Sequence, residues 1–301
     1  MNIYSSISAN IWKSYVILVL FIIFAAAVAY VIGKATGYGS SAGVLVFIIA
    51  IIYSWVSYFY SDKIVLASSG AKEIKKKENP ELFHIVENLS IGDGVPMPRV
   101  YIINDPSPNA FATGRDPKHA AVAATTGILE RLTKAELEGV IAHELSHVKN
   151  YDTRLMAITA VLVGFIAMIT DFFMRGVFWG SFSNNDSDNR DSRVQLIFFV
   201  LAIVFAILAP IVASLIQLAI SRKRELLADA SGALLTRYPE GLARALEKIA
   251  ADPKPLKRAS NATAHLYISN PFKNKGFAGS ISNLFSTHPP IEERIKILRS
   301  M

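Results

Sequence analysis

Two histidines and a glutamate lie close together in the stretch GVIAHELSHVKN (139–150). His143 and His147 are four residues apart, so on a helix both imidazoles project from one face, one turn apart. Two such rings can bind one zinc ion at about 2.0–2.1 Å each. Glu144 lies about 100° further around the helix, where it can reach a metal-bound water without being a ligand. The spacing therefore predicts two metal ligands and a general base, the groups that hydrolyse a bond with an activated water.

A catalytic zinc ion takes a third protein ligand and keeps a fourth position for water. The chain has no cysteine, so this ligand must offer nitrogen or oxygen. The best candidate is Glu225 in SRKRELLADASG (221–232), with Asp229 four residues later on the same helix face. We expect Glu225 to bind the ion and Asp229 to accept a hydrogen bond from a ligating histidine, which fixes its tautomer. Without the histidine motif, a solvated helix face would be the better interpretation of this pair of acids.

One zinc ion per chain is expected at this site, although the spacing alone does not separate zinc from other divalent ions. Local signals place its residues on regular elements. Thr133 and Glu136 have the spacing of a capping box, which predicts that the helix with both histidines begins there. Asn79 followed by Pro80 predicts the start of another helix. Short strands are predicted at 99–103, 109–114 and 120–126.

The composition indicates a membrane protein. Hydrophobic residues make up 52% of the 301 residues and charged residues only 18%, against roughly 25% charged in ordinary soluble domains. Four runs are long enough to cross a bilayer, for which about 20 apolar residues are needed. They extend over about 14–32, 42–60, 155–174 and 194–220. Buried helices of a soluble core are the alternative, but such helices seldom stay apolar over this length.

Lysine and arginine are unevenly distributed around these runs. Ten lie on the side of the two termini and four on the other side, which favours a cytoplasmic location for both termini. The membrane flanks account for the formal net charge of +7, so no nucleic-acid partner is expected. The expected organisation is a membrane hairpin, a first polar part, a second hairpin and a second polar part, with both polar parts forming one cytoplasmic domain of mainly α structure with a small β-sheet. Their bounds are 1–60, 61–154, 155–220 and 221–301.

Five motifs, in the same order along the chain, resemble those of one known family. They are PMPRVYII (96–103), NAFATG (109–114), HELSH (143–147), RELLAD (224–229) and THPPIEER (287–294). In these motifs the chain is similar to the HtpX family of membrane-embedded zinc endopeptidases, which is related to the CAAX prenyl proteases. The four apolar runs favour the HtpX branch, because the prenyl proteases carry more membrane spans. The resemblance implies a gluzincin-type domain in the cell membrane that clears misfolded or damaged membrane proteins.

For the metal site, the resemblance implies His143, His147 and Glu225 as zinc ligands and Glu144 as catalytic acid/base. Polypeptide substrates and the lipid bilayer are then the expected partners. Two other functions are compatible with the motifs. One is an inactive membrane adaptor, against which the intact Glu144 argues, since only catalysis requires that residue. The other is processing of prenylated CAAX proteins, which a cleavage assay on a prenylated peptide would separate.

The resemblance also suggests residues that contact substrate. In the family, the stretch that corresponds to NAFATG is an edge strand beside the metal, and an exposed edge can pair with an extended peptide. Asn109, Ala110, Phe111 and Ala112 are therefore candidates for substrate binding, with an ordinary strand as the alternative. His288, in STHPP, has two open interpretations: it assists the oxyanion that develops during hydrolysis, or it braces the last helix.

Overall fold

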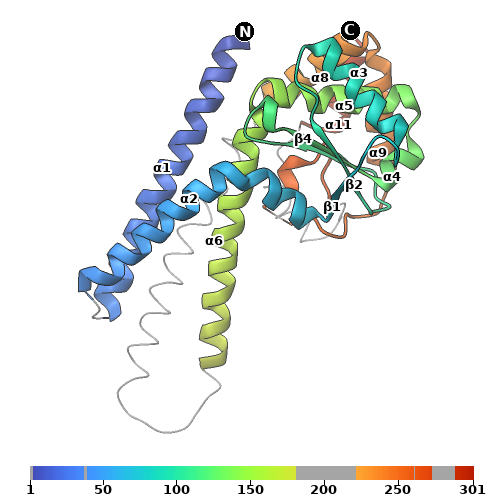
Figure 1. Cartoon of the computed structure of the whole chain (residues 1–301). Helices are drawn as coiled ribbons and strands as arrows, with labels where there is room; N and C mark the ends of the chain where they lie inside the picture. The colour runs from blue at the N-terminus through green and yellow to red at the C-terminus, as the bar shows by residue number, and fades with distance from the viewer. Residues whose placement is uncertain (1–2, 37–38, 181–221, 261, 273–288) are drawn as a thin grey trace.

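The structure, a computed structural model, describes residues 3–36, 39–180, 222–260, 262–272 and 289–301. Over these residues the chain is mostly helical and carries one small mixed sheet, in agreement with the predicted combination of elements. Three long helices project from a unit in which shorter helices surround the sheet (Figure 1).

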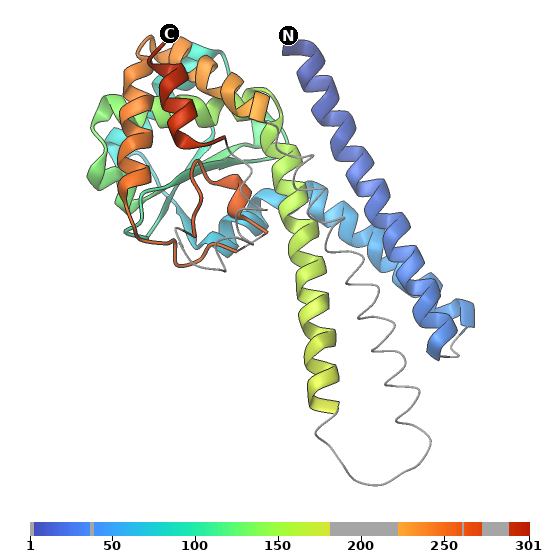
Figure 2. The same cartoon turned by 180° about the vertical axis from the view of Figure 1, so that it is seen from behind.

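The long helices are α1 (Ile3–Thr36), α2 (Gly39–Ser69) and α6 (Asp152–Gly180). They lie side by side in both views (Figures 1 and 2). Aromatic rings join them: the Tyr53 ring of α2 lies 5.9 Å from the Phe21 ring of α1 and 4.0 Å from the Phe165 ring of α6, measured between centroids. The α2 helix is continuous across residues 60 and 61, where the sequence predicts the end of the first hairpin.

Among the residues that the structure describes, one helical segment, Ile7–Ala27 of α1, is long and apolar enough to cross a membrane. The second and third predicted spans coincide with parts of α2 and α6. The fourth, at 194–220, lies outside the described residues, as does the predicted loop at 181–192. Four membrane spans therefore stay a prediction.

The sheet has four strands in the order β1-β2-β4-β3. The central strands β2 and β4 are parallel, and each edge strand is antiparallel to its neighbour. The strand β1 pairs Lys72 with Ile102 and was not predicted from the sequence, because its three residues carry no apolar alternation. The strands are β1 (Ala71–Glu73), β2 (Arg99–Ile103), β3 (Ala110–Thr113) and β4 (Ala121–Thr125).

The predicted helix starts are present. Asn79 accepts a hydrogen bond from the Leu82 N–H at 2.9 Å, and the helix that follows ends before Gly94, whose φ of +69° suits a glycine. The Thr133 N–H donates to the Glu136 carboxylate at 2.7 Å at the start of the helix with both histidines. The helices around the sheet are α3 (Pro80–Asp93), α4 (Thr126–Arg131), α5 (Lys134–Lys149), α8 (Arg222–Thr236), α9 (Pro239–Ala251) and α11 (Ile291–Leu298), with short 3-10 helices η1 (Pro117–His119) and η2 (Ala264–Leu266).

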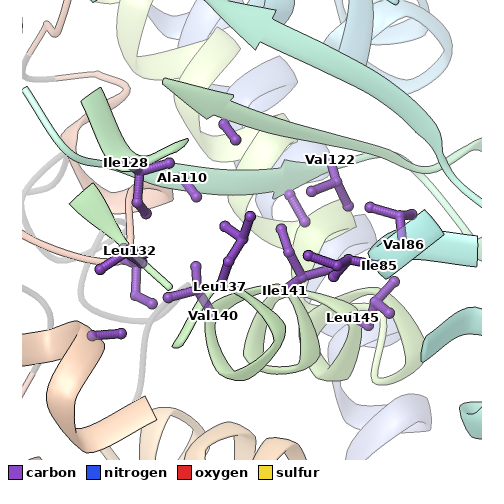
Figure 3. Close-up of a cluster of buried hydrophobic side chains, with 14 of the residues drawn as sticks. Ile85, Val86, Ala110, Val122, Ile128, Leu132, Leu137, Val140, Ile141 and Leu145 are labelled. Atoms are coloured by element: carbon purple, nitrogen blue, oxygen red, sulfur yellow. The ribbon is translucent and has the colours of Figure 1, made fainter. Parts of the chain in front are cut away.

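One face of the sheet packs on α5. Ala110 and Val122 of the strands face Val140, Ile141 and Leu145 of the helix, and all five are buried (Figure 3). Burial of a Val, Ile or Leu side chain contributes about 1.5–3 kcal/mol. This packing fixes α5 relative to the sheet, and so it also fixes the positions of His143 and His147 on the helix relative to β3.

Candidate metal centre

Three donor groups from two separate parts of the chain meet beside α5. They are the Nε2 atoms of His143 and His147 and the carboxylate of Glu225 from α8, and all lie within 4.8 Å of one another. The two Nε2 atoms are 3.1 Å apart. Glu225 oxygens lie 3.8 Å from the first nitrogen and 3.5 Å from the second. All three side chains are buried.

These distances fit one divalent ion. Tetrahedral coordination with bonds of about 2.0–2.1 Å places neighbouring ligand atoms roughly 3.3–3.4 Å apart. The three measured separations, 3.1, 3.5 and 3.8 Å, bracket this value. The imidazole rings of His143 and His147 pack edge to face, with their planes at 87° and their centroids 4.7 Å apart. The three residues can hold a metal ion and leave a fourth position open.

Close packing of α8 on α5 brings Glu225 to the histidines. Glu225, Asp229 and Gly232 lie on one face of α8, at i, i+4 and i+7. A Cβ at Gly232 would be 3.0 Å from the His143 backbone nitrogen, tighter than ordinary contact, so a larger residue would require the two helices to move apart by a few tenths of an ångström. The glycine is therefore part of the arrangement that positions the carboxylate.

Asp229 fixes the orientation of the first histidine. Its carboxylate lies 2.9 Å from His143 Nδ1, which leaves Nε2 directed at the centre of the site. The fully buried Arg294 of α11 donates to both Asp229 oxygens, at 2.8 and 2.7 Å. Burial alone would raise the pKa of Asp229, but the Arg294 charge and hydrogen bonds outweigh it and hold that pKa at about 2. Burial lowers the pKa of His143 to about 4, which keeps the ring neutral and able to bind a metal at neutral pH.

The second histidine has a carboxylate of its own, which the sequence reasoning missed. His147 Nδ1 lies 2.8 Å from Asp152, only five residues further along the chain. A continued helix would carry residue 152 away from His147. The chain instead breaks between α5 and α6 at Tyr151, whose φ of +60° is left-handed, and the reversal returns Asp152 to the ring. The only signal in the sequence was an acid shortly after the motif.

Asp152 also connects the site to the first long helix. The buried Asn10 of α1 donates to Asp152 at 2.8 Å and, with the same amide, to the Asn150 carbonyl at 2.8 Å. Arg224, next to the ligand Glu225 in the sequence, pairs with Asp152 as well. The metal site is thus supported by α1, α5, α6 and α8 together.

Glu144 lies directly beside the donor groups but faces β3. Its carboxylate accepts a hydrogen bond from the Ala112 N–H at 2.8 Å. Burial raises the pKa of Glu144 to about 8, with the nearby Glu225 charge adding to the effect. A carboxyl group with a pKa in this range can both accept and return a proton near neutral pH.

The strand β3 lies at the edge of the sheet, but the expectation of an exposed edge is wrong. All four of its residues are buried. The Ala110 carbonyl, which points away from β4, accepts a hydrogen bond from the Ile268 N–H at 3.0 Å. The outward Ala112 N–H is the donor to Glu144. The physical reason for the burial is that the segment 267–269 covers the free edge.

Side chains hold this covering segment in place. The Asn109 amide donates to the Ser269 carbonyl at 3.0 Å, and the Phe111 ring packs edge-on against Tyr267 with centroids 5.1 Å apart. Arg294 donates to the Ile268 carbonyl at 3.1 Å. Both main-chain groups of Ile268 are therefore hydrogen-bonded: its N–H donates to the Ala110 carbonyl, and its C=O accepts from the Arg294 side chain.

The other histidines lie apart from the donor triangle. His84 and His119 are half exposed and face Glu87 and Asp116, while the buried His265 contacts the Met156 carbonyl at 3.0 Å. His288 lies outside the described residues, so its two interpretations stay open.

An HExxH helix with a carboxylate from a second helix as third donor is an arrangement of metallopeptidases. The family model described as Peptidase family M48 matches residues 76–301. Two similar proteins are each named Protease HtpX homolog. The one from Tropheryma whipplei (strain Twist) is 48% identical over 298 residues, which cover 99% of this chain and 98% of that protein. The one from Caldanaerobacter subterraneus subsp. tengcongensis is 44% identical over 300 residues, which cover 100% and 98%.

The chain therefore belongs to peptidase family M48 and, within it, to the HtpX proteases. It is a metallopeptidase by family, and the grouped donor atoms of His143, His147 and Glu225 agree with this. Among solved structures, the crystal structure of S. mikatae Ste24p matches with a TM-score of 0.49 and 19% identity, covering 96% of this chain and 67% of that one.

Proposed function

We propose that this chain is a zinc-dependent endopeptidase of the cell membrane that cleaves misfolded or damaged membrane proteins on the cytoplasmic side. The observation that carries the proposal is the buried triangle of His143, His147 and Glu225, with Glu144 beside it. Two imidazoles, one carboxylate and an open fourth position are the ligand set of catalytic zinc sites.

The residues around the ion would divide the work as follows. His143, His147 and Glu225 hold zinc, and each ring is kept in the right tautomer by a carboxylate on its Nδ1. When bound, zinc lowers the pKa of a coordinated water and polarises the scissile carbonyl. The buried carboxylates next to the ligands also supply negative charge, which favours binding of a divalent cation.

Glu144 is the proposed acid/base. Its carboxylate would take the proton of the attacking water and deliver it to the nitrogen of the departing amine. The hydrogen bond from Ala112 keeps its carboxylate on the strand side of the site, where the scissile bond of a peptide along β3 would lie. His288, if it reaches this point, would assist the oxyanion.

Substrate binding is proposed at Asn109, Ala110, Phe111 and Ala112. The outward backbone groups of β3 are those that an extended peptide would use. The Ala110 carbonyl is now bound by the Ile268 N–H of the segment 267–269, and the Ala112 N–H donates to Glu144. The proposal therefore requires this segment to leave the edge when a peptide binds.

The membrane location is supported by the way the ligands are attached. His147 lies five residues before the start of α6, which contains the third predicted span, and Glu225 lies in the first turn of α8, just after the fourth. Pairing of the two spans would bring the third ligand to the first two. Since the chain has no cysteine, single cysteines placed at the termini and within 181–192 can be labelled from either side of the membrane. Labelling of the termini from outside would contradict the proposed orientation.

The decisive experiment compares metal content and proteolysis in matched variants of the full chain. His147→Ala and Glu225→Ala are expected to lose zinc and activity together. Glu144→Gln is expected to retain zinc and lose cleavage of a membrane-protein substrate. A Glu144→Gln enzyme that still cleaves at the wild-type rate would show that the base is another residue, and preferential cleavage of a prenylated CAAX peptide would favour the related function.

A further inference from the structure

A cationic cavity lies beside the C-terminal half of α2, separate from the metal centre. It has a volume of about 530 Å³ and shares no lining residue with the donor triangle. Four basic side chains line it, Lys63, Arg99, Arg115 and Lys118, against one carboxylate, Asp62. The cavity thus joins the end of a long helix to β2 and to the turn between β3 and β4.

Among the described residues, two of these four cations pair with a carboxylate and two do not. Arg99 is paired with Asp62 at 2.5 Å. Arg115 lies 3.6 Å from Asp116 and donates to a backbone carbonyl of α2 at 3.2 Å. Neither Lys63 nor Lys118 has a carboxylate within 4.0 Å among the residues that the structure describes, and Lys63 instead lies over the Tyr60 ring. The cavity therefore has capacity for an anion.

An exposed apolar stripe leads along α2 into the cavity. Ile48, Ile52, Trp55 and Phe59 follow one another at i, i+4, i+7 and i+11, so they lie on one face of the helix. All four are exposed, although they lie in the second predicted membrane span. The next position on this face is Lys63. The surface is thus apolar along the helix and cationic at its end.

From the cationic cavity and the apolar stripe together, we infer that the cavity binds the headgroup phosphate of an anionic phospholipid, with the acyl chains along the apolar stripe. A free phosphate or an acidic peptide would use the cations but not the stripe. The inference rests on the proposed function, because α2 must cross the membrane with Lys63 at the cytoplasmic surface. Juxtamembrane lysines and arginines attract anionic lipids at that surface, and Trp55 and Tyr60 lie where interfacial aromatics are expected.

Such a lipid would set the height of the peptidase site above the membrane. Arg115 and Lys118 belong to the connection that follows β3, and Arg99 begins β2. A phosphate held by these residues would keep the sheet, and with it β3 beside the metal site, at a constant position relative to the bilayer surface.

The experiment uses the full chain in nanodiscs. Trp12 and Trp179 are replaced by Phe, which leaves Trp55 as the only tryptophan of the three. Quenching by brominated phosphatidylglycerol is compared with quenching by brominated phosphatidylcholine. We expect the anionic lipid to be preferred, and the preference to fall about 30-fold in Arg115→Gln/Lys118→Gln, since each cation near the surface contributes about 1 kcal/mol.

The matched control is Lys134→Gln/Lys296→Gln, which removes two exposed positive charges far along the chain from the cavity. It is expected to keep the preference. An unchanged preference in the cavity variant, equal losses in both variants, or displacement of the lipid by inorganic phosphate alone would overturn the inference. Absence of quenching by either lipid would instead contradict the membrane location of α2, while zinc content and proteolysis of the same samples report separately on the proposed peptidase.

Discussion

Replacement of Asp152 by alanine should weaken metal binding, although Asp152 is not a ligand. The carboxylate accepts the hydrogen bond from His147 Nδ1 at 2.8 Å in a buried setting. Loss of such a partner typically lowers metal affinity about 10–100-fold. This corresponds to about 1.4–2.8 kcal/mol, and a hydrogen bond to a charged group contributes about 1.5–3 kcal/mol. The two values agree, so we expect the zinc Kd to rise by one to two orders of magnitude.

The assay is competition for zinc between the purified full chain and a chelator of known affinity. Asp105→Ala is the matched control, because Asp105 is also buried and accepts hydrogen bonds, from the Ser107 and Lys257 N–H groups at 3.0 and 2.8 Å, but contacts no ligand. Asp152→Asn should give an intermediate Kd, since its amide oxygen can accept the same hydrogen bond without the charge.

An Asp152→Ala protein with wild-type affinity would refute the argument that this carboxylate orients His147. Equal weakening by Asp105→Ala would refute it as well, because the effect would then come from a general loss of stability. Thermal unfolding of the metal-free variants separates these outcomes. Asn10→Leu, which removes the support that α1 gives to Asp152, should weaken binding in the same direction but less.

Three further predictions follow from the site. In the metal-free protein, the unfolded chain releases the Glu144 proton near a pKa of 4.5, while the folded chain keeps it up to a pKa of about 8. Between these two pH values the wild type should lose stability as pH rises relative to Glu144→Gln; a constant difference in melting temperature would contradict this. Arg294→Met should reduce the free energy of unfolding by about 3–5 kcal/mol, because it leaves the buried Asp229 carboxylate without its cationic partner. Arg294→Met/Asp229→Asn should recover part of the loss in denaturant titrations. Ile268→Pro removes the N–H that reaches the Ala110 carbonyl; if a peptide uses this edge, kcat/KM for an unfolded substrate should rise, whereas an unchanged value would indicate another binding edge.

Local signals in the sequence were sufficient for most elements around the site. The capping box at Thr133 and the Asn79-Pro80 start depend on contacts within a few residues, so they could be identified without a fold. The spacing of His143 and His147 likewise follows from helix geometry alone. The short strand β1 was not predicted, because its pairing with β2 is decided by a partner some 30 residues away.

The covering of β3 could not be predicted for a related reason. The small and apolar residues of NAFATG are compatible with an exposed or a buried edge. Only the fold brings Tyr267 and Ile268, more than 150 residues later, to the same strand. That segment has no periodic pattern from which its position could be inferred.

By itself, the sequence determined the chemistry of the site: which side chains can bind a metal, which can carry a proton, and the absence of thiolate ligands. It determined these because residue type and helical spacing are local properties. The tertiary structure alone decided that Gly232 lets α8 approach α5, that a left-handed Tyr151 returns Asp152 to His147, and that Arg294 is buried against Asp229. These are contacts between distant segments, and their energies depend on packing and burial that no local pattern records.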